Sequence, residues 1–373
     1  MAAIPALLPS ATFRDELRKR GGAAASRCYQ CATCSAVCDL APADAPFPRR
    51  QMLQAQWGLG DTLAADPSVW LCHQCNDCTT RCPRDAKPGD VLQAVRSLTI
   101  ERLAFPHAIG ALVARARLTW PLLMGLPVLF WAALLAFTGH LGVPGGLAEK
   151  WAYESLVPHR FIYAVFFPVA AWVLVASWVS GRRFWALIGS SDARQGSFLA
   201  GLWPTLGEIA THKRFGSCTT AKPRQLGHLT LLWGFVGAAV TSGLLIVGIY
   251  AQHLEMPLAL THPYKLLGNA SMVLLLIGIA VLVGNRLGDA KAAGAATAFD
   301  TFFLSLVVLV VLTGTAVEMV RLAGDAGLGL TLYILHLGVV MSLFLTFPYS
   351  KFAHMLYRTL ALTHARMVGL IKT

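Results

Sequence analysis

Residues 28–38 read CYQCATCSAVC, and residues 72–83 read CHQCNDCTTRCP. In both runs the cysteines follow the spacing C-x2-C-x2-C-x3-C, and the second run continues with a proline. The two runs hold eight of the nine cysteines of this 373-residue chain, and the ninth is Cys218. A regular spacing that occurs twice predicts two metal centres of the same type.

This spacing is typical of ligands for [4Fe–4S] clusters. Three thiolates in one tight turn reach three irons of one cube, whereas the fourth cysteine points away and serves the other cluster. The spacing therefore predicts two ligand sets, which are Cys28, Cys31, Cys34 and Cys82 for one cluster and Cys72, Cys75, Cys78 and Cys38 for the other. Zinc sites usually combine two C-x2-C pairs, and disulfides are rare in cytoplasmic domains. Because the link 39–71 is long and has helical character at 50–58, we expect an α-helical ferredoxin domain.

The remainder of the chain is apolar enough for a membrane. Overall 55% of residues are apolar and 13% are charged, whereas an ordinary soluble domain is about a quarter charged. A bilayer crossing needs about 20 residues, and six stretches of roughly that length are uncharged apart from Glu318 near the end of the fifth: 118–138, 161–180, 229–251, 266–284, 301–320 and 331–350. We therefore expect a head over residues 1–117 and a six-span transmembrane domain over 118–373.

The distribution of basic residues predicts the orientation of these spans. The loops and tail at 181–227, 285–299 and 351–373 carry thirteen Lys and Arg, against four in the alternate loops. The positive-inside rule then places the head and the C-terminus on the cytoplasmic side of the membrane. We expect this membrane to be a bacterial inner membrane. The net charge of +12 comes largely from basic residues that flank the spans. Because no run of basic residues with interleaved aromatics occurs, this charge does not indicate nucleic-acid binding. The first 20 residues lack the apolar core of a secretory signal.

Histidines near the membrane spans are candidate heme ligands, because polar groups in lipid are costly and usually functional. His336 lies inside the sixth stretch and His354 follows it eighteen residues later. On one helix this separation is five turns, so both side chains would share a face and lie near opposite membrane surfaces. His228 opens the third stretch at the level of His354, and His262 (or His253) lies on the outer side with His336. The alternative is an interfacial side chain for His228 and His354, and an ordinary loop histidine outside the membrane for His262.

The head resembles the C-type subunit of heterodisulfide reductases, on the twin cysteine runs 28–38 and 72–82. The membrane part resembles the cytochrome b subunit of the same enzymes and the gamma subunit of respiratory nitrate reductase, on His336, His354 and His228. The gamma family has a further ligand where this chain has Ala238. The resemblance implies an all-α fold, an α-helical two-cluster ferredoxin domain fused to a six-helix transmembrane cytochrome b bundle.

The fusion of both modules in one chain resembles the C-type component of the quinone-interacting membrane-bound oxidoreductase complex. That resemblance implies one or two b hemes, menaquinone or ubiquinone as substrate, and electron exchange with two cytoplasmic flavin and iron–sulfur subunits. Through them it implies a link to adenylylsulfate reductase and dissimilatory sulfur metabolism. No quinone pocket can be read from the sequence, although Lys351 and Glu255 are candidate proton-exchange groups.

Two other functions remain open at this point. One is the membrane subunit of a heterodisulfide or thiol–disulfide reductase complex, and the other is a membrane-anchored iron–sulfur sensor or docking module without turnover. The role of Cys218 is also open, between a structural thiol and a reactive or heme-proximal one. The chain offers no second catalytic centre, because it contains no glycine-rich dinucleotide fingerprint after a strand and no Ser/His/Asp arrangement.

Overall fold

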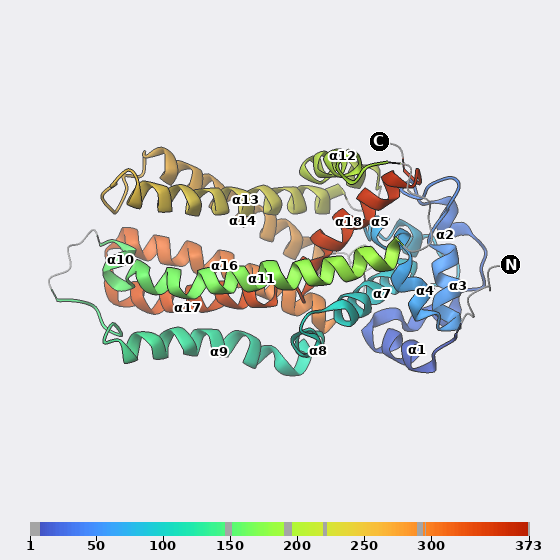
Figure 1. Ribbon diagram of the computed structural model, residues 1–373, viewed down its shortest axis with the longest axis horizontal. Coiled ribbons are helices and arrows are strands. Elements are labelled where there is room, and N and C mark those ends of the chain that lie inside the picture. Colours follow the sequence, from blue (N-terminus) through green and yellow to red (C-terminus); the bar gives the residue numbers. More distant parts are fainter. Residues whose placement is uncertain are drawn as a thin grey trace.

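The computed structural model of the chain describes residues 8–145, 151–189, 196–218, 222–288, 294 and 296–371. Every regular element in these ranges is a helix, so the predicted all-α fold is confirmed. The molecule is elongated, with the long helices side by side toward one end and the short N-terminal helices gathered at the other (Figure 1).

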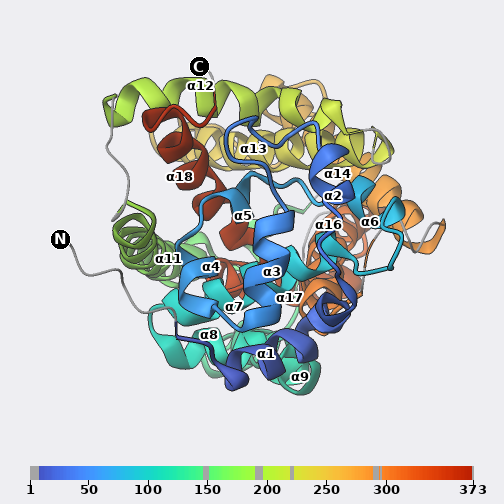
Figure 2. The ribbon, with the colours of Figure 1, turned by 90° about the vertical axis from the view of Figure 1, so that its right-hand side faces the viewer.

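The head consists of short helices packed around one longer helix. The short ones are α1 (Ala11–Leu17), η1 (Arg18–Gly22), η2 (Ala23–Arg27), α2 (Thr33–Ala36), α3 (Arg49–Trp57), α4 (Gly60–Ala65), α5 (Ser68–Leu71) and α6 (Asp77–Thr80). The longer helix is α7 (Pro88–Leu103), which lies behind α3 and α4 when the head is viewed end-on (Figure 2). Val91, Leu92 and Val95 of α7 are completely buried. α3 confirms the helical character predicted for 50–58.

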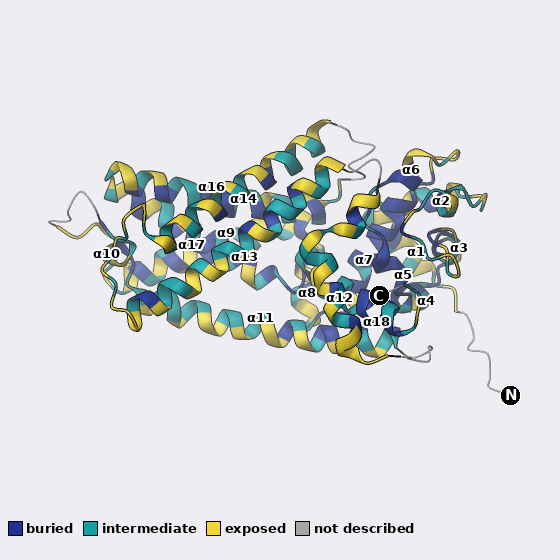
Figure 3. Ribbon diagram, turned by 90° about the horizontal axis from the view of Figure 1, so that it is seen from above, coloured by how far each residue is buried: buried dark blue, intermediate teal, exposed yellow. Residues whose placement is uncertain are grey.

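Six helices of the second part are long and apolar enough to cross a membrane. They are α9 (Ala116–Phe137), α11 (His159–Ile188), α13 (Lys222–Tyr250), α14 (Pro263–Gly288), α16 (Ala298–Ala323) and α17 (Ala326–Thr346). Each contains most of one predicted stretch, and the chain is therefore a multi-pass membrane protein. Figure 3 shows exposed residues along the outward sides of these helices. Phe137, Leu174 and Trp178 are among the exposed apolar side chains, as expected for surfaces that face lipid rather than water.

Shorter helices connect the spans and join them to the head. α8 (His107–Ala114) precedes the first span, and α10 (Tyr153–Leu156) lies at the end of the bundle far from the head (Figure 1). α12 (Phe198–Thr211) and η3 (Lys213–Ser217) lead into α13 at the end that carries the head. η4 (Lys351–Ala353) and α18 (His354–Met367) follow the last span.

The prediction that His336 and His354 lie on one face of a single helix is wrong. α17 ends at Thr346, and a new helix, α18, begins at His354. Between them Pro348 lacks the N–H that a continuing helix needs. The Ser350 side chain accepts a hydrogen bond from the Phe352 N–H and so caps the short turn η4. The helical register that would relate the two histidines is therefore lost between them.

The head and the adjoining ends of the membrane helices share one hydrophobic core. Trp70 of α5 stacks on Tyr357 of α18 with ring centroids 5.0 Å apart. Phe184 of α11 packs against both rings, at centroid distances of 5.7 and 4.9 Å. All three side chains are at most 1% exposed. Since α18 packs on the head, the head and the C-terminal helix lie at the same end of the bundle (Figure 2).

We expect Trp70→Ala to lower the free energy of unfolding by about 3–5 kcal/mol, because the deletion leaves a cavity in the core that joins the two parts. Chemical denaturation of the purified protein in detergent measures this loss. Trp57→Ala is the matched control, since Trp57 is 53% exposed on α3 and a surface change costs within about 0.5 kcal/mol. Equal losses from the two variants would contradict the shared core.

Candidate functional site

The first cysteine pocket brings together Cys28, Cys31, Cys34 and Cys82. Three come from the first run around α2, and Cys82 comes from the end of the second run. Cys31 is exposed. These are the four residues that the spacing assigns to one cluster.

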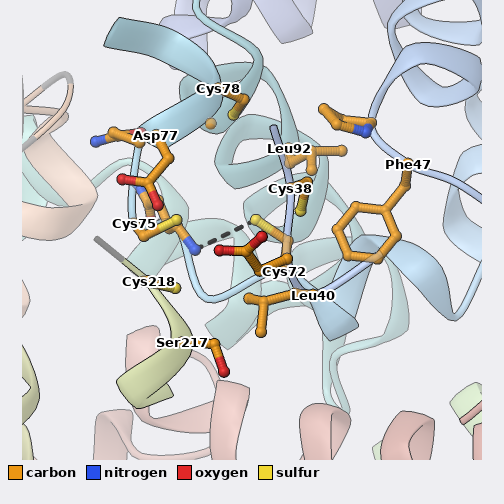
Figure 4. Close-up of a pocket in the computed structure, with 15 residues that line it drawn as sticks. Cys38, Leu40, Phe47, Cys72, Cys75, Asp77, Cys78, Leu92, Ser217 and Cys218 are labelled. Atoms are coloured by element: carbon orange, nitrogen blue, oxygen red, sulfur yellow. Dashed lines mark hydrogen bonds between the residues drawn. The ribbon is translucent and has the colours of Figure 1, made fainter. Parts of the chain in front are cut away.

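The second cysteine pocket is lined by Cys72, Cys75, Cys78 and Cys38, the other predicted set (Figure 4). Cys72 and Cys78 are buried, each 8% exposed. A fifth cysteine, Cys218, lines the same pocket together with Ser217. Cys218 comes from the loop between α12 and α13, so the second part of the chain contributes to a site formed by the head.

Both cysteine runs adopt the same unusual backbone. Gln30 and Ala32 in the first run and Gln74 and Asn76 in the second have φ between +55° and +69°. A left-handed conformation costs a residue other than glycine about 1–3 kcal/mol, and such residues gather at functional sites. The turn directs backbone N–H groups toward sulfur, as for the Gln74 N–H, which donates to Cys72 Sγ at 3.2 Å.

The donor sets fit [4Fe–4S] clusters. Burial raises the pKa of Cys34 to about 11 and that of Cys38 to about 12, so neither thiol would ionise at neutral pH without a compensating positive charge. The thiolate is the form that binds metal, and iron ions supply that charge. Sets of four cysteines in this spacing are the ligands that such clusters use.

The Cys75 and Cys218 side chains are joined by a hydrogen bond. This bond, followed by burial, raises the pKa of Cys218, whereas it lowers the pKa of Cys75. With Cys75 bound to iron as a thiolate, Cys218 would be the member of the pair that still carries a proton to donate. The sulfur atoms of Cys75 and Cys218 and a carboxylate oxygen of Asp77 all lie within 4.8 Å of one another.

Arginine side chains fasten the second pocket to the membrane part. Arg224 of α13 donates to the carbonyls of His73 and Gln74, both at 2.7 Å. Arg358 of α18 donates to the Cys72 carbonyl and to His73 Nδ1, and Arg96 of α7 donates to the Cys72 carbonyl at 3.0 Å. These guanidinium groups place positive charge next to a site that would hold a negatively charged cluster.

A row of rings leads from this pocket into the membrane part. His73, next to Cys72, stacks on Phe215 of η3 with centroids 5.3 Å apart. Phe215 lies 6.5 Å from His212, and His212 lies 5.5 Å from His228. His228 in turn lies 5.9 Å from His354. The structure thus brings together two of the predicted heme ligands, His228 and His354.

The hydrogen bonds of the paired histidines leave one nitrogen of each ring available. His354 Nδ1 bonds the Lys351 carbonyl, so Nδ1 carries the proton. His212 Nδ1 donates to the Ile209 carbonyl at 2.7 Å, which makes its Nε2 the acceptor for His228 Nδ1 at 3.5 Å. Nε2 of both His228 and His354 then carries no proton and has a lone pair that could bind a metal ion, as in a metal-bound imidazole.

The separation of these two rings also fits a shared iron. Metal–imidazole bonds are about 2 Å long, so nitrogens on opposite sides of one ion lie about 4 Å apart and the ring centroids somewhat further. The observed centroid distance of 5.9 Å is of that size. The separation of the two rings therefore allows both to bind one iron ion.

The other two predicted ligands, His336 and His262, have separate surroundings. His336 Nδ1 bonds Thr313 Oγ1 of α16 at 2.9 Å. His262 packs against Tyr264, whose backbone N–H donates to His262 Nδ1. Among the described residues no ring contact joins His336 to His262, so this structure does not assemble them as a pair.

Sequence reasoning left the role of Cys218 open and did not identify Arg224 and Arg358, although all three contribute to the second pocket or its loop. They are distant along the chain from the cysteine runs and follow no spacing rule. His212, the hydrogen-bond partner of His228, was also missed. Pro348, which indicates the break between α17 and α18, was a signal available in the sequence.

Comparison with known proteins supports both parts of the chain. Residues 24–86 match the 4Fe-4S dicluster domain family. The C-type subunit of the H(2):CoB-CoM heterodisulfide,ferredoxin reductase of Methanothermobacter thermautotrophicus is 35% identical over 86 residues, which are 23% of this chain and 46% of the relative. An Archaeoglobus profundus protein named for its likeness to the C-type subunit of heterodisulfide reductase is 38% identical over 86 residues, 23% of this chain and 44% of the relative. The chain thus spans less than half the length of these two curated relatives.

A further relative extends over nearly the whole chain. The Escherichia coli citrate utilization protein B is 27% identical over 357 residues, covering 90% of this chain and 88% of the relative. No solved structure matches. Residues 104–369 match the citrate utilization protein B family, and they make up well over half of the chain. With a head similar to the C-type subunit of heterodisulfide reductases fused to this membrane part, the chain belongs to the citrate utilization protein B family.

Proposed function

We propose that this chain is the membrane-embedded electron-transfer subunit of an oxidoreductase complex. The observation that carries the proposal is the continuous row of rings from the second cysteine pocket to the His228–His354 pair. Two [4Fe–4S] clusters and a b-type heme would supply one-electron transfer when bound. The side chains of this protein hold those groups, orient them and exclude water.

The two cysteine pockets differ in exposure, and this difference supports an order in which the two clusters would pass electrons between a soluble partner and the membrane part. Cys31 of the first pocket is exposed, which favours contact with a soluble partner. Cys72 of the second pocket is buried, and its carbonyl accepts from Arg358 of α18. The first pocket would therefore face the partner, and the second would face the membrane part.

His228 and His354 would hold the heme nearest the head through their Nε2 atoms, and that heme would supply one-electron transfer. Lys351 and His212 fix the tautomers through hydrogen bonds to Nδ1, and such bonds make a ligating imidazole more basic. A second heme on His336 and His262 remains a prediction from the sequence. The cytoplasmic location of the head, in a bacterial inner membrane, likewise rests on the distribution of basic residues.

The partner and the electron donor are the finer part of the proposal. The relatives of the head are subunits of heterodisulfide reductases by name, which supports a thiol–disulfide reductase-type complex. The pairing of His228 of the apolar helix α13 with His354, which follows the last span, supports exchange with membrane quinone, menaquinone or ubiquinone. The sequence resemblance also predicts two kinds of partner: two flavin and iron–sulfur subunits, and adenylylsulfate reductase. Both stay predictions. A sensor or docking module without turnover would need neither the histidine pair nor quinone.

We expect the purified protein to carry about eight non-heme irons and a b-type absorption band that a quinol analogue reduces. Absorption spectra before and after addition of the quinol, with iron and heme quantified on the same sample, measure this. Reduction by a thiol donor through an added partner protein, but not by quinol, would favour the thiol–disulfide reductase complex. Protein with iron but no heme would overturn the membrane half of the proposal.

A further inference from the structure

Cys218 occupies an unusual position for a cysteine outside the two motifs. It follows η3 in the loop between α12 and α13, yet it is 2% exposed and lines the second cysteine pocket. In Figure 4 its sulfur lies close to Cys75, on the side of the pocket opposite Cys78. The membrane part thus places a thiol against a pocket whose four predicted ligands all come from the head.

The loop that presents Cys218 is held from both sides. The Cys218 N–H donates to the Phe215 carbonyl at 3.2 Å, and Phe215 stacks on His73 of the head. The neighbouring Arg214 donates to the Leu40 carbonyl at 2.7 Å. The position of the thiol relative to the pocket is therefore set by contacts between the two parts of the chain.

A role for Cys218 as a cluster ligand fits less well than a role as a hydrogen-bond donor. The motif already supplies one thiolate for each of four irons. Cys218 lies beside one of these ligands, because its sulfur is within 4.8 Å of Cys75 Sγ and of Asp77. Cys218 therefore does not replace a missing ligand. A thiol beside Cys75 can instead donate its proton to the Cys75 sulfur.

We propose that Cys218 is a positioning residue for the second cluster, whose S–H group donates to Cys75 Sγ and raises the reduction potential of the cluster. Hydrogen bonds to ligand sulfurs are one of the factors that set the potential of such clusters. Reduction adds negative charge, and a donor next to the sulfur stabilises that charge. The membrane part thereby tunes the electron carrier nearest to it. This inference rests on the two-cluster head of the proposed function.

The test is a potentiometric titration of the full chain in detergent, followed by electron paramagnetic resonance. Cys218→Ala is expected to shift the second cluster to a lower potential, with the first cluster and the iron content unchanged. Cys218→Ser keeps a donor and is expected to shift the potential less. Ser217→Ala is the matched control, since Ser217 lines the same pocket, and it should leave both potentials unchanged. A Cys31→Ser variant assigns the two signals.

Two results would overturn the inference. Loss of iron in Cys218→Ala would make Cys218 a ligand, and equal potentials in Cys218→Ala and the unaltered protein would make it a packing residue. Reduction by a quinol analogue, recorded on the same samples, tests the proposed function separately. If the quinol analogue reduces none of the samples, the quinone link of the proposed function is wrong. A measured shift in potential would still support the role of Cys218.

Discussion

Replacing His354 with alanine is expected to abolish the heme proposed for the His228–His354 pair, because it removes one of the two side chains that would hold it. If that is the only heme, b-type absorbance falls to background; if a second heme is present, absorbance falls about twofold. The ring of His354 lies 5.9 Å from that of His228 and its Nδ1 is bonded to the Lys351 carbonyl. Absorption spectra of equal amounts of purified protein, reduced with dithionite, measure the loss.

Two further variants make this result specific. His228→Ala is expected to give the same loss as His354→Ala, because the proposal assigns both side chains to one heme iron. His336→Ala separates one heme from two: with one heme its absorbance matches that of the unaltered protein, and with two it falls by about half. The content of non-heme iron should stay unchanged in all three variants. Full heme absorbance in His354→Ala would refute the assignment of the pair.

Replacing Cys31 with serine is expected to remove about half of the non-heme iron and to stop electron exchange with soluble acceptors. Cys31 is an exposed member of the ligand set predicted for the first pocket, so heme content and reduction by quinol should persist. Iron analysis and stopped-flow absorption with an artificial soluble acceptor measure the two effects.

Cys75→Ser gives a complementary outcome, since Cys75 lines the second pocket. It is also expected to remove about half of the iron, but from the cluster whose loop Arg224 and Arg358 fasten to the membrane part. The two variants should therefore lose different paramagnetic signals. Loss of all iron from either single variant would show that the clusters do not assemble independently.

Much of the fold could be predicted because its signals are local. An apolar stretch long enough to cross a bilayer must form a helix there, since lipid offers no partner for free backbone groups. All six predicted stretches correspond to helices of that kind. Length and polarity do not show where a helix ends, so the stretch 331–350 does not by itself predict the break between α17 and α18, within which Pro348 lies.

The cysteine sites show the same division between local and distant information. The spacing within each run places three sulfurs in one turn. The two runs together predict that the fourth cysteine of each run joins the ligand set of the other. The two pockets contain those sets, with Cys82 in the first and Cys38 in the second. Cys218 follows no spacing rule, because its distance from Cys75 depends on how the α12–α13 loop packs against the head.

By itself, the sequence determined the helical class, the number of membrane spans and the grouping of eight cysteines, because each depends on residues within one turn, one span or one repeated motif. The tertiary structure alone decided what joins the two parts. The core of Trp70, Phe184 and Tyr357, the arginines on the Cys72 loop and the row of rings to His354 unite residues far apart in the chain. Packing brings such residues together through contacts whose geometry no local pattern records.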